Sequence, residues 1–443
     1  MIPNNIMTKK FIKTIVGSLL ATGLLLTDAV AQQTPAPKQT RAISIEGATA
    51  HLGNGQVIEN SLIMFDKGKI TFVGSANARI ARQGEIIKAT GKHVYPGFIA
   101  ANTSLGLAEI DAVRATRDFD EVGTMLPHIR SIIAYNTESR VVETMRPNGV
   151  FIAQVTPRGG RISGTSSVVQ LDAWNWEDAS VKLDDAIHIN WPSIFTRGRW
   201  WLGEVSDLKP NKQYPVAVNQ LKDFFQRAKL YLQGDRTAVN LPYEALEQVF
   251  KGRKKVFVHV NGKKSISDAI HFFKKLGINS VVIVGGHEAE QVASLLSTNN
   301  IPVVLKRAHR LPTKEDEDYD LPFRSAKILT DAGILVGVGM SGDMERMSTR
   351  NLPFYAGTYG AYGLGKEKAV QLITGNNAKI LGIDKQMGTL EVGKDATLFI
   401  SEGDALDMRT NILTKAYIQG RALSLDTHQT KLWKRYSNKY KNQ

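Results

Sequence analysis

Alternating apolar and polar residues mark the first folded part of the chain and predict short β-strands. Residues 61–65 and 69–73 are rich in apolar side chains and flank the turn Asp66-Lys67-Gly68, which is typical of a β-hairpin. Residues 85–88 predict a further short strand. The region 42–95 is therefore expected to be a small β domain.

The middle of the chain has a different pattern, in which short β-branched runs alternate with amphipathic segments. Residues 256–260 and 280–284 are apolar runs, and the segment 265–276 between them has apolar side chains at helical spacing. Repeated βα units of this kind predict a parallel sheet that is buried on both faces. A (β/α)8 barrel and a doubly wound sheet both fit this pattern.

The strand pattern returns at residues 388–392, 396–400 and 416–423. Because β segments flank the central region on both sides, we prefer the barrel and expect the two chain ends to build one β domain. The predicted fold is a (β/α)8 TIM-type barrel with a composite β-sandwich domain. Its predicted parts are the β-sandwich segments 42–95 and 386–425, the barrel 96–385 and a basic C-terminal tail 426–443.

The N-terminal segment resembles a secretory signal peptide. Lysines precede the apolar run 15–26, which ends near the small-residue motif Ala29-Val30-Ala31. The run is too short to cross a bilayer comfortably, and no cysteine follows it for lipidation. We expect cleavage of residues 1–31, a flexible leader at 32–41, and export to the periplasm if the source is a Gram-negative bacterium.

Composition narrows the chemistry further. The chain has no cysteine, which excludes disulfides, thiolate metal sites and thiol catalysis. Its formal net charge is +14, but the expected export argues against a nucleic-acid partner. Five basic residues surround Trp433, Tyr436 and Tyr440 near the C-terminus. This basic tail could touch anionic lipid, or it could be an ordinary frayed end.

Two stretches resemble signatures of the amidohydrolase superfamily, and most closely its imidazolonepropionase-like group. Residues 95–105, read as YPGFIAANTSL, are similar to the first barrel strand of that superfamily, usually PGFIDAHTHL. Residues 376–384 and 388–399 are similar to its closing signature, NPAKILGL followed by GSIEVGKDADLVV. The resemblance implies a metal-dependent hydrolase of C–N bonds, with its metal at the C-terminal mouth of the barrel.

The same resemblance indicates that most metal ligands have been replaced. The two histidine positions of the first strand are Asn102 and Ser104, the sixth-strand position is Gly285, and the eighth-strand aspartate position is Ser341. Only the fifth-strand histidine, His259, is retained. A catalytic zinc site ordinarily has three strong protein ligands. We therefore expect no metal at the ancestral position and no cofactor.

A rebuilt site is the alternative. His287 lies two residues after Gly285, and Asp343 lies two residues after Ser341. If both strands continue that far, a two-residue step keeps a side chain on the same face. His259, His287 and Asp343 would then form a two-histidine, one-carboxylate set for zinc or another divalent metal.

Four further residues are candidates for substrate binding. Arg114 and Arg117 follow the predicted first strand, and either could pair with an acidic substrate or join an internal salt-bridge network. Arg161 and Ser163 lie in the Gly- and Ser-rich stretch 159–167, which could be an anion-binding loop or a hydroxyl-capped turn.

Three functions remain open on the sequence. The resemblance alone implies a C–N hydrolase, and the rebuilt site is a second catalytic possibility. The replaced ligands favour a metal-free protein that binds an unidentified small molecule, or a non-catalytic partner in a hetero-oligomer with an intact amidohydrolase.

Overall fold

The computed structural model describes residues 34–198, 202–203, 208–236, 238–312, 314, 316–340 and 345–441. The chain divides into two compact units, Met1–Pro35 and Ala36–Gln443, and the second unit contains all the features described below. The predicted signal peptide, 1–31, lies outside the described residues. Within the described part of the chain, no helix is long and apolar enough to cross a membrane.

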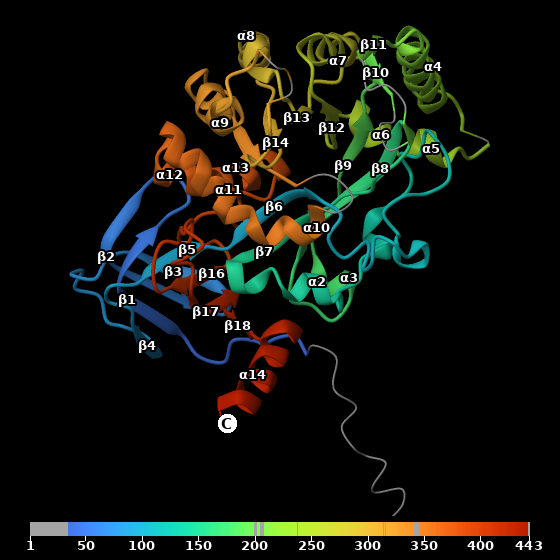
Figure 1. Cartoon of the computed structure of the whole chain (residues 1–443). Coiled ribbons are helices and arrows are strands. Elements are labelled where there is room, and N and C mark those ends of the chain that lie inside the picture. The colour runs from blue at the N-terminus through green and yellow to red at the C-terminus, as the bar shows by residue number, and fades with distance from the viewer. Residues whose placement is uncertain are drawn as a thin grey trace, which may run out of the picture. The chain divides into compact units, whose positions relative to one another are not determined.

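The centre of the fold is a nearly closed eight-stranded sheet (Figure 1). The strands pair in order from β6 to β15. A parallel bridge between Ala101 and Gly339 connects the two edges of this sheet. This arrangement confirms the TIM-type barrel. Its strands in chain order are β6 (Phe98–Thr103), β7 (Val150–Val155), β8 (Ile162–Gln170), β9 (Ser180–Asn190), β12 (Lys255–Val260), β13 (Val281–Gly285), β14 (Val303–Leu305) and β15 (Val336–Val338).

One barrel strand departs from the predicted parallel order. β8 pairs antiparallel with both β7 and β9, whereas the other neighbouring strands are parallel. Only residues 156–161 separate β7 from β8. This connection is too short for a helical crossover, which needs a dozen or more residues. Gly159 and Gly160 have φ values of 79° and 56°, which supports a tight reversal of the chain here.

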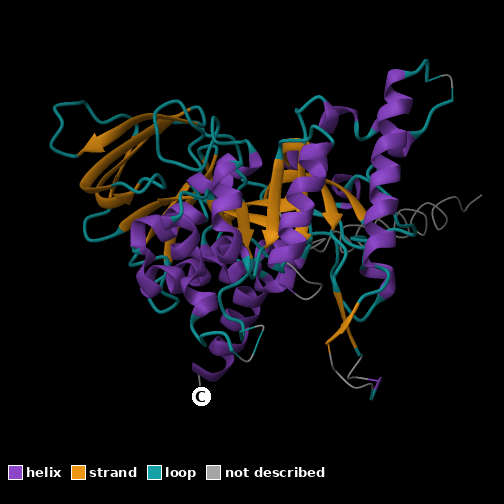
Figure 2. Cartoon of the chain, turned by 90° about the horizontal axis from the view of Figure 1, so that it is seen from above, coloured by secondary structure: helices purple, strands orange, loops and turns teal. Residues whose placement is uncertain are grey.

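Helices cover the outside of the barrel (Figure 2). α7 shows why they form: Ile266, Ala269, Ile270 and Phe273 are buried at helical spacing, as the sequence predicts for this segment. The main helices are α4 (Tyr214–Gln233), α7 (Lys263–Lys275), α8 (Ala293–Thr298), α9 (Leu321–Asp331), α11 (Leu352–Tyr359), α12 (Lys366–Leu372), α13 (Gly375–Leu381) and α14 (His428–Lys441).

A second eight-stranded sheet combines both ends of the described chain. β5 pairs in parallel with β1 and antiparallel with β16, so it joins the N-terminal strands to the C-terminal ones. Phe399 of this sheet packs its ring against Phe98 and Phe151 of the barrel, with ring centres 5.1 and 5.7 Å apart. The strands are β1 (Ile43–His51), β2 (Val57–Asp66), β3 (Lys69–Ser75), β4 (Glu85–Lys88), β5 (His93–Pro96), β16 (Leu398–Ser401), β17 (Leu413–Ile418) and β18 (Arg421–Ala422).

Short elements fill the connections. The strands β10 (Phe195–Arg197) and β11 (Leu208–Pro210) form a separate hairpin. The short helices are η1 (Arg114–Thr116), η2 (Ser131–Ala134), α2 (Arg140–Glu143), η3 (Arg146–Asn148), α3 (Trp176–Ala179), α5 (Leu241–Glu244), α6 (Glu247–Phe250), η5 (Ala289–Val292), α10 (Glu345–Ser348), η6 (Thr349–Asn351) and η7 (Gly360–Leu364).

Candidate functional site

A chain of hydrogen bonds connects neighbouring barrel strands. His259 of β12 contacts His188 of β9, with 2.9 Å between His259 Nε2 and His188 Nδ1. His188 Nε2 lies 2.9 Å from Ser166 Oγ on β8, and that hydroxyl donates to Asp185 Oδ1 at 2.7 Å. His188, Ser166 and Asp185 are buried, while His259 is partly exposed. The chain therefore leads from the barrel end to an interior carboxylate.

Gln154 of β7 fixes the direction of these hydrogen bonds. The backbone N–H of Asn102 donates to Gln154 Oε1 at 3.0 Å, so the amide nitrogen of Gln154 faces and donates to Asp185 Oδ2 at 2.8 Å. Ser166 gives its hydroxyl hydrogen to Asp185, so its oxygen must accept from His188 Nε2–H. His188 Nδ1 then accepts from His259 Nε2–H. This leaves the Nδ1 lone pair of His259 available as an acceptor.

Burial and nearby cations set the protonation states of the side chains in this hydrogen-bonded series. Burial lowers the pKa of His188 well below its usual value, and His259 and Arg158 lower it further. The pKa of His259 is also well below its usual value, because of burial first and then the charges of Arg158 and Lys306. Burial raises the pKa of Asp185. Both histidines are therefore held as neutral imidazoles.

The guanidinium of Arg158 binds Asn102, the residue at the first-strand position that resembles a metal-binding histidine position. Arg158 donates through Nη1 to Asn102 Oδ1 at 2.9 Å and through Nη2 to the Asn102 carbonyl at 3.0 Å. Asn102 has a φ of 52°, a left-handed conformation that asparagine adopts more readily than most residues. Its side chain also donates to the Met340 carbonyl at 2.9 Å. Asn102 is thus fully engaged in binding Arg158 and the backbone.

The sixth-strand position is filled by a neighbouring amide. Gly285 ends β13 with a φ of 99°, and a Cβ atom built there would lie 2.4 Å from Asn261 Oδ1. A ligand side chain at 285 would therefore need Asn261 to move. Ser104 is buried, and its hydroxyl has no hydrogen-bond partner among the described residues.

These residues do not fit the metal that the fold family implies. Asn102 and Ser104 offer only neutral oxygens, position 285 has no side chain, and His259 uses Nε2 to contact His188. Across the described ranges, no group of three or more His, Cys, Asp or Glu side chains is placed to hold a metal ion.

The rebuilt site is only partly within the described structure. β13 ends at Gly285, and Gly285 and Gly286 both have positive φ, so the strand does not continue to His287, which was the condition for the rebuilt site. His287 is partly buried, and burial with the charges of Arg310 and Lys306 lowers its pKa to about 3. Ser341 and Asp343 lie outside the described residues.

The four candidate binding residues lie in two regions, the connection between β6 and β7 and the turn that leads into β8 with the start of that strand. Arg114 and Arg117 lie between β6 and β7, and Arg114 Nη1 donates to the Arg117 carbonyl at 2.8 Å. Arg161 donates to the Asn190 carbonyl at 2.9 Å, and Ser163 Oγ donates to the Gly159 carbonyl at 2.7 Å. Burial lowers the pKa of Arg161. These internal bonds favour the hydroxyl-capped turn over an anion-binding loop at 159–163.

Sequence reasoning missed Arg158, His188 and Asp185. His188 could have been found from its position in the sequence. Like His259, it stands between two β-branched residues, and an asparagine follows each of these short runs. Asp185 and Arg158 gave no such signal, because their roles depend on contacts between strands.

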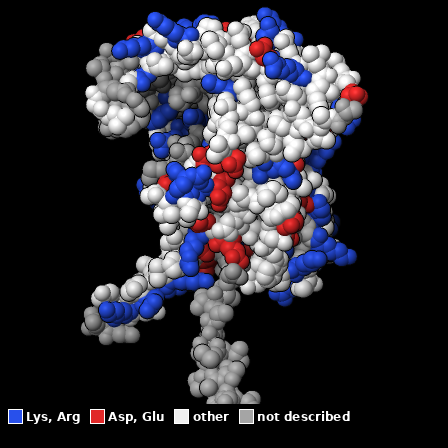
Figure 3. Space-filling view, turned by 90° about the vertical axis from the view of Figure 1, so that its right-hand side faces the viewer, with Lys and Arg blue, Asp and Glu red and all other residues white. Residues whose placement is uncertain are grey.

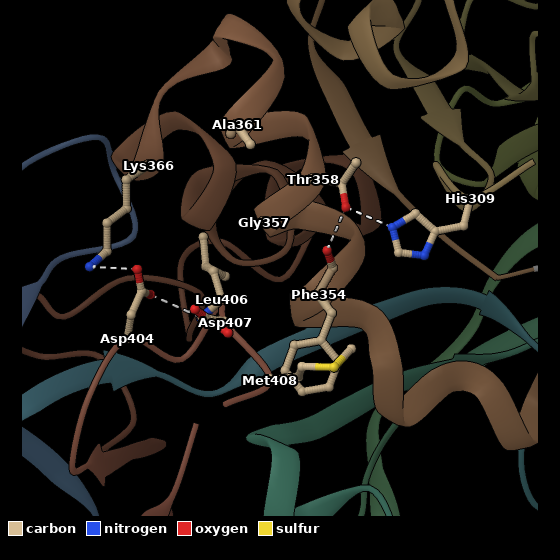
Figure 4. A pocket seen from close by; sticks show the side chains of 11 residues that line it. His309, Phe354, Gly357, Thr358, Ala361, Lys366, Asp404, Leu406, Asp407 and Met408 are labelled. Carbon is tan, nitrogen blue, oxygen red and sulfur yellow. Dashed lines mark hydrogen bonds and ion pairs between the residues drawn. The ribbon is translucent and has the colours of Figure 1, made fainter. Parts of the chain in front are cut away.

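A separate cavity of about 530 Å³ lies between α11, η7 and residues 404–408 (Figure 4). Lys366 forms an ion pair with Asp404 at 3.0 Å on one side of it, and His309 Nε2 lies 2.7 Å from Thr358 Oγ1 on the other. Its lining shares no residue with the His188–His259 chain. The cavity and the barrel-end site are therefore distinct features.

The fold defines a TIM-type barrel protein with a second sheet built from both ends of the described chain. At the barrel end, Arg158 binds Asn102 and His188 contacts His259. Residues 320–428 match the model of the amidohydrolase family. No curated protein matches the sequence significantly. An amidohydrolase from Thermotoga maritima MSB8 is similar in structure over 86% of this chain and 99% of its own, with a TM-score of 0.74 and 23% identity.

Two other solved structures share the fold at lower similarity. A prolidase complexed with N-methylphosphonate-L-proline is 16% identical, with a TM-score of 0.53 over 86% of this chain and 99% of its own. An adenosine deaminase from Xanthomonas campestris with bound zinc is 14% identical, with a TM-score of 0.52 over 92% and 99% of the two chains. The family match covers residues 320–428, and the structural similarities show that the chain shares the fold of these proteins.

Proposed function

We propose that this chain is a metal-free member of the superfamily that binds a small anionic molecule at the C-terminal end of its barrel. The observation that carries the proposal is the guanidinium of Arg158, held by two hydrogen bonds on Asn102. A fixed cation thus lies at the strand end where the family pattern has a metal ligand. Export through cleavage of residues 1–31 is part of the same proposal.

The electrostatics support an anionic ligand. The positive charges of Arg158 and Lys306 both lower the pKa of His259, so both cations act on this one side chain. Arg158 also acts on His188. Guanidinium groups suit carboxylate and phosphate because their planar donors match paired oxygens. The ligand class is therefore a small molecule with a carboxylate or phosphate group.

The low pKa of His188 and His259 makes them weak bases, which suits binding rather than activation of water. The His259 lone pair can accept a hydrogen bond from a ligand, since its other nitrogen contacts His188. Hydrolysis of a C–N bond through His259, His287 and Asp343 is the alternative. It would require Asp343 to approach His259, and no observation favours it over binding.

Arg158→Gln is expected to weaken binding of a dicarboxylate probe about tenfold, because one charge-assisted contact is lost. Succinate and inorganic phosphate serve as probes, measured by titration calorimetry on the mature chain. Arg409→Gln is the matched control, since Arg409 pairs with Asp407 on the surface. Equal binding by the wild type and Arg158→Gln would refute the assigned ligand position. Arg158→Lys, which keeps the charge, separates a binding defect from a folding defect.

A further inference from the structure

The C-terminal helix α14 exposes an aromatic face. Trp433, Tyr436 and Tyr440 are spaced three and four residues apart, so they lie on one side of the helix. Their exposed fractions are 66, 53 and 63%. No residue of α14 is buried, and the helix projects from the body as an arm (Figure 3). Three large aromatic rings together on a projecting helix form an unpartnered face.

The rest of α14 is strongly basic. Residues 428–441 contain five Lys and Arg side chains and no Asp or Glu. Arg435 and Lys439 lie over the rings of Tyr436 and Tyr440, at 5.6 and 5.5 Å from the ring centres. Long basic side chains beside exposed Trp and Tyr are the features of helices that lie in the headgroup region of a membrane.

The helix is attached to the body at its base. The His428 N–H donates to Glu143 Oε1 at 2.6 Å, whereas the aromatic face lies further along the helix. Asp172 binds both the N–H of Ala36 and the guanidinium of Arg421, at 2.9 and 2.7 Å. Ala36, the first residue of the second unit, therefore lies beside β18. This strand is the last one before α14 in the sequence. A polar helix of this length is marginal in water without a partner.

We propose that α14 docks the protein on the surface of a bilayer that contains anionic phospholipid. Trp433, Tyr436 and Tyr440 would lie at the level of the headgroups, and the flanking cations would contact the phosphates. The charge of the helix selects anionic over neutral lipid, and its exposed aromatic rings supply the apolar contact. This surface is independent of the barrel-end site.

The test is co-sedimentation of the mature chain, residues 32–443, with lipid vesicles. We expect binding to vesicles of phosphatidylglycerol and phosphatidylethanolamine, little binding to phosphatidylcholine, and weaker binding at high salt. The triple variant Arg435→Gln, Lys439→Gln, Lys441→Gln is expected to reduce affinity at least about tenfold. The variant Trp433→Ala, Tyr436→Ala, Tyr440→Ala is expected to do the same.

A matched control removes the same charge from another exposed helix. The variant Lys222→Gln, Arg227→Gln, Lys229→Gln on α4 should bind vesicles within about twofold of the wild type. An unchanged thermal midpoint checks that each variant is folded. Equal losses in both charge variants would overturn the proposal by showing a non-specific charge effect. It would also be overturned if the α14 variants bound vesicles as the wild type does and changed only the mass of the protein in light scattering, which would assign the face to contact with a second copy of this chain.

Discussion

Gly285→Ala is expected to lower the free energy of unfolding by about 2–3 kcal/mol. An L-residue at a φ of 99° is strained, which costs about 1–2 kcal/mol, and the new Cβ would lie 2.4 Å from Asn261 Oδ1. Asn261 is exposed and its amide can rotate away, so the overlap adds only about 1 kcal/mol, the low end of the cost of overpacking. Urea unfolding of the two proteins under identical conditions measures the difference.

Two further variants separate strain from overlap. Gly252 also has a positive φ, 70°, but a Cβ there would meet nothing within 4 Å, so Gly252→Ala should show the backbone term alone. Adding Asn261→Ala to Gly285→Ala should return part of the lost stability. If Gly285→Ala and Gly252→Ala cost the same, Asn261 does not fill the sixth-strand ligand position, and a main argument against the family metal site fails.

The difference in unfolding free energy between His287→Gln and the wild type is expected to be about 2 kcal/mol more favourable to the variant at pH 5 than at pH 8. The folded pKa of His287 is about 3, below its ordinary value of 6.5, so the unfolded chain binds the extra proton. His287 therefore makes stability fall as the pH drops from 6.5 toward 3, by about 1.4 kcal/mol per pH unit. The substitution removes that loss. Urea unfolding at pH 8, 6.5 and 5 follows it.

The exposed residue His271 provides the control for this experiment. It lies on α7 and bonds only the backbone of its own helix, with 2.7 Å from Nδ1 to the Ser267 carbonyl. His271→Gln makes the same substitution at an exposed helix position, so that the pH profiles of the two variants can be compared directly. A wild-type pH profile in His287→Gln would show that His287 titrates freely. The positive charges of Arg310 and Lys306 would then not act at the end of β13 as described.

The barrel and the resemblance to the amidohydrolase family could be recognised in the sequence because their signals are local. The run 256–260, the helix after it and the closing signature at 376–399 each carry their pattern within one stretch. The same local reading gave Asn102, Ser104 and Gly285 as replaced ligand positions. It could not show what replaced them.

The chemistry of the site depends on contacts that no local pattern encodes. His188 and His259 are 71 residues apart, and Arg158 and Asn102 are 56 apart. The antiparallel β8 was missed because the turn at 159–160 also fits a ligand loop. At the C-terminus, the basic tail forms a helix with an exposed aromatic face rather than an irregular end.

The central claim, that this barrel works without a metal, is tested most directly by metal analysis. The mature chain, purified without chelators or a histidine tag, would be measured by inductively coupled plasma mass spectrometry. We predict less than about a tenth of an equivalent of zinc, iron or manganese, because three strong ligands are not provided at the family positions. Near-stoichiometric metal that is lost in His259→Ala would contradict the account.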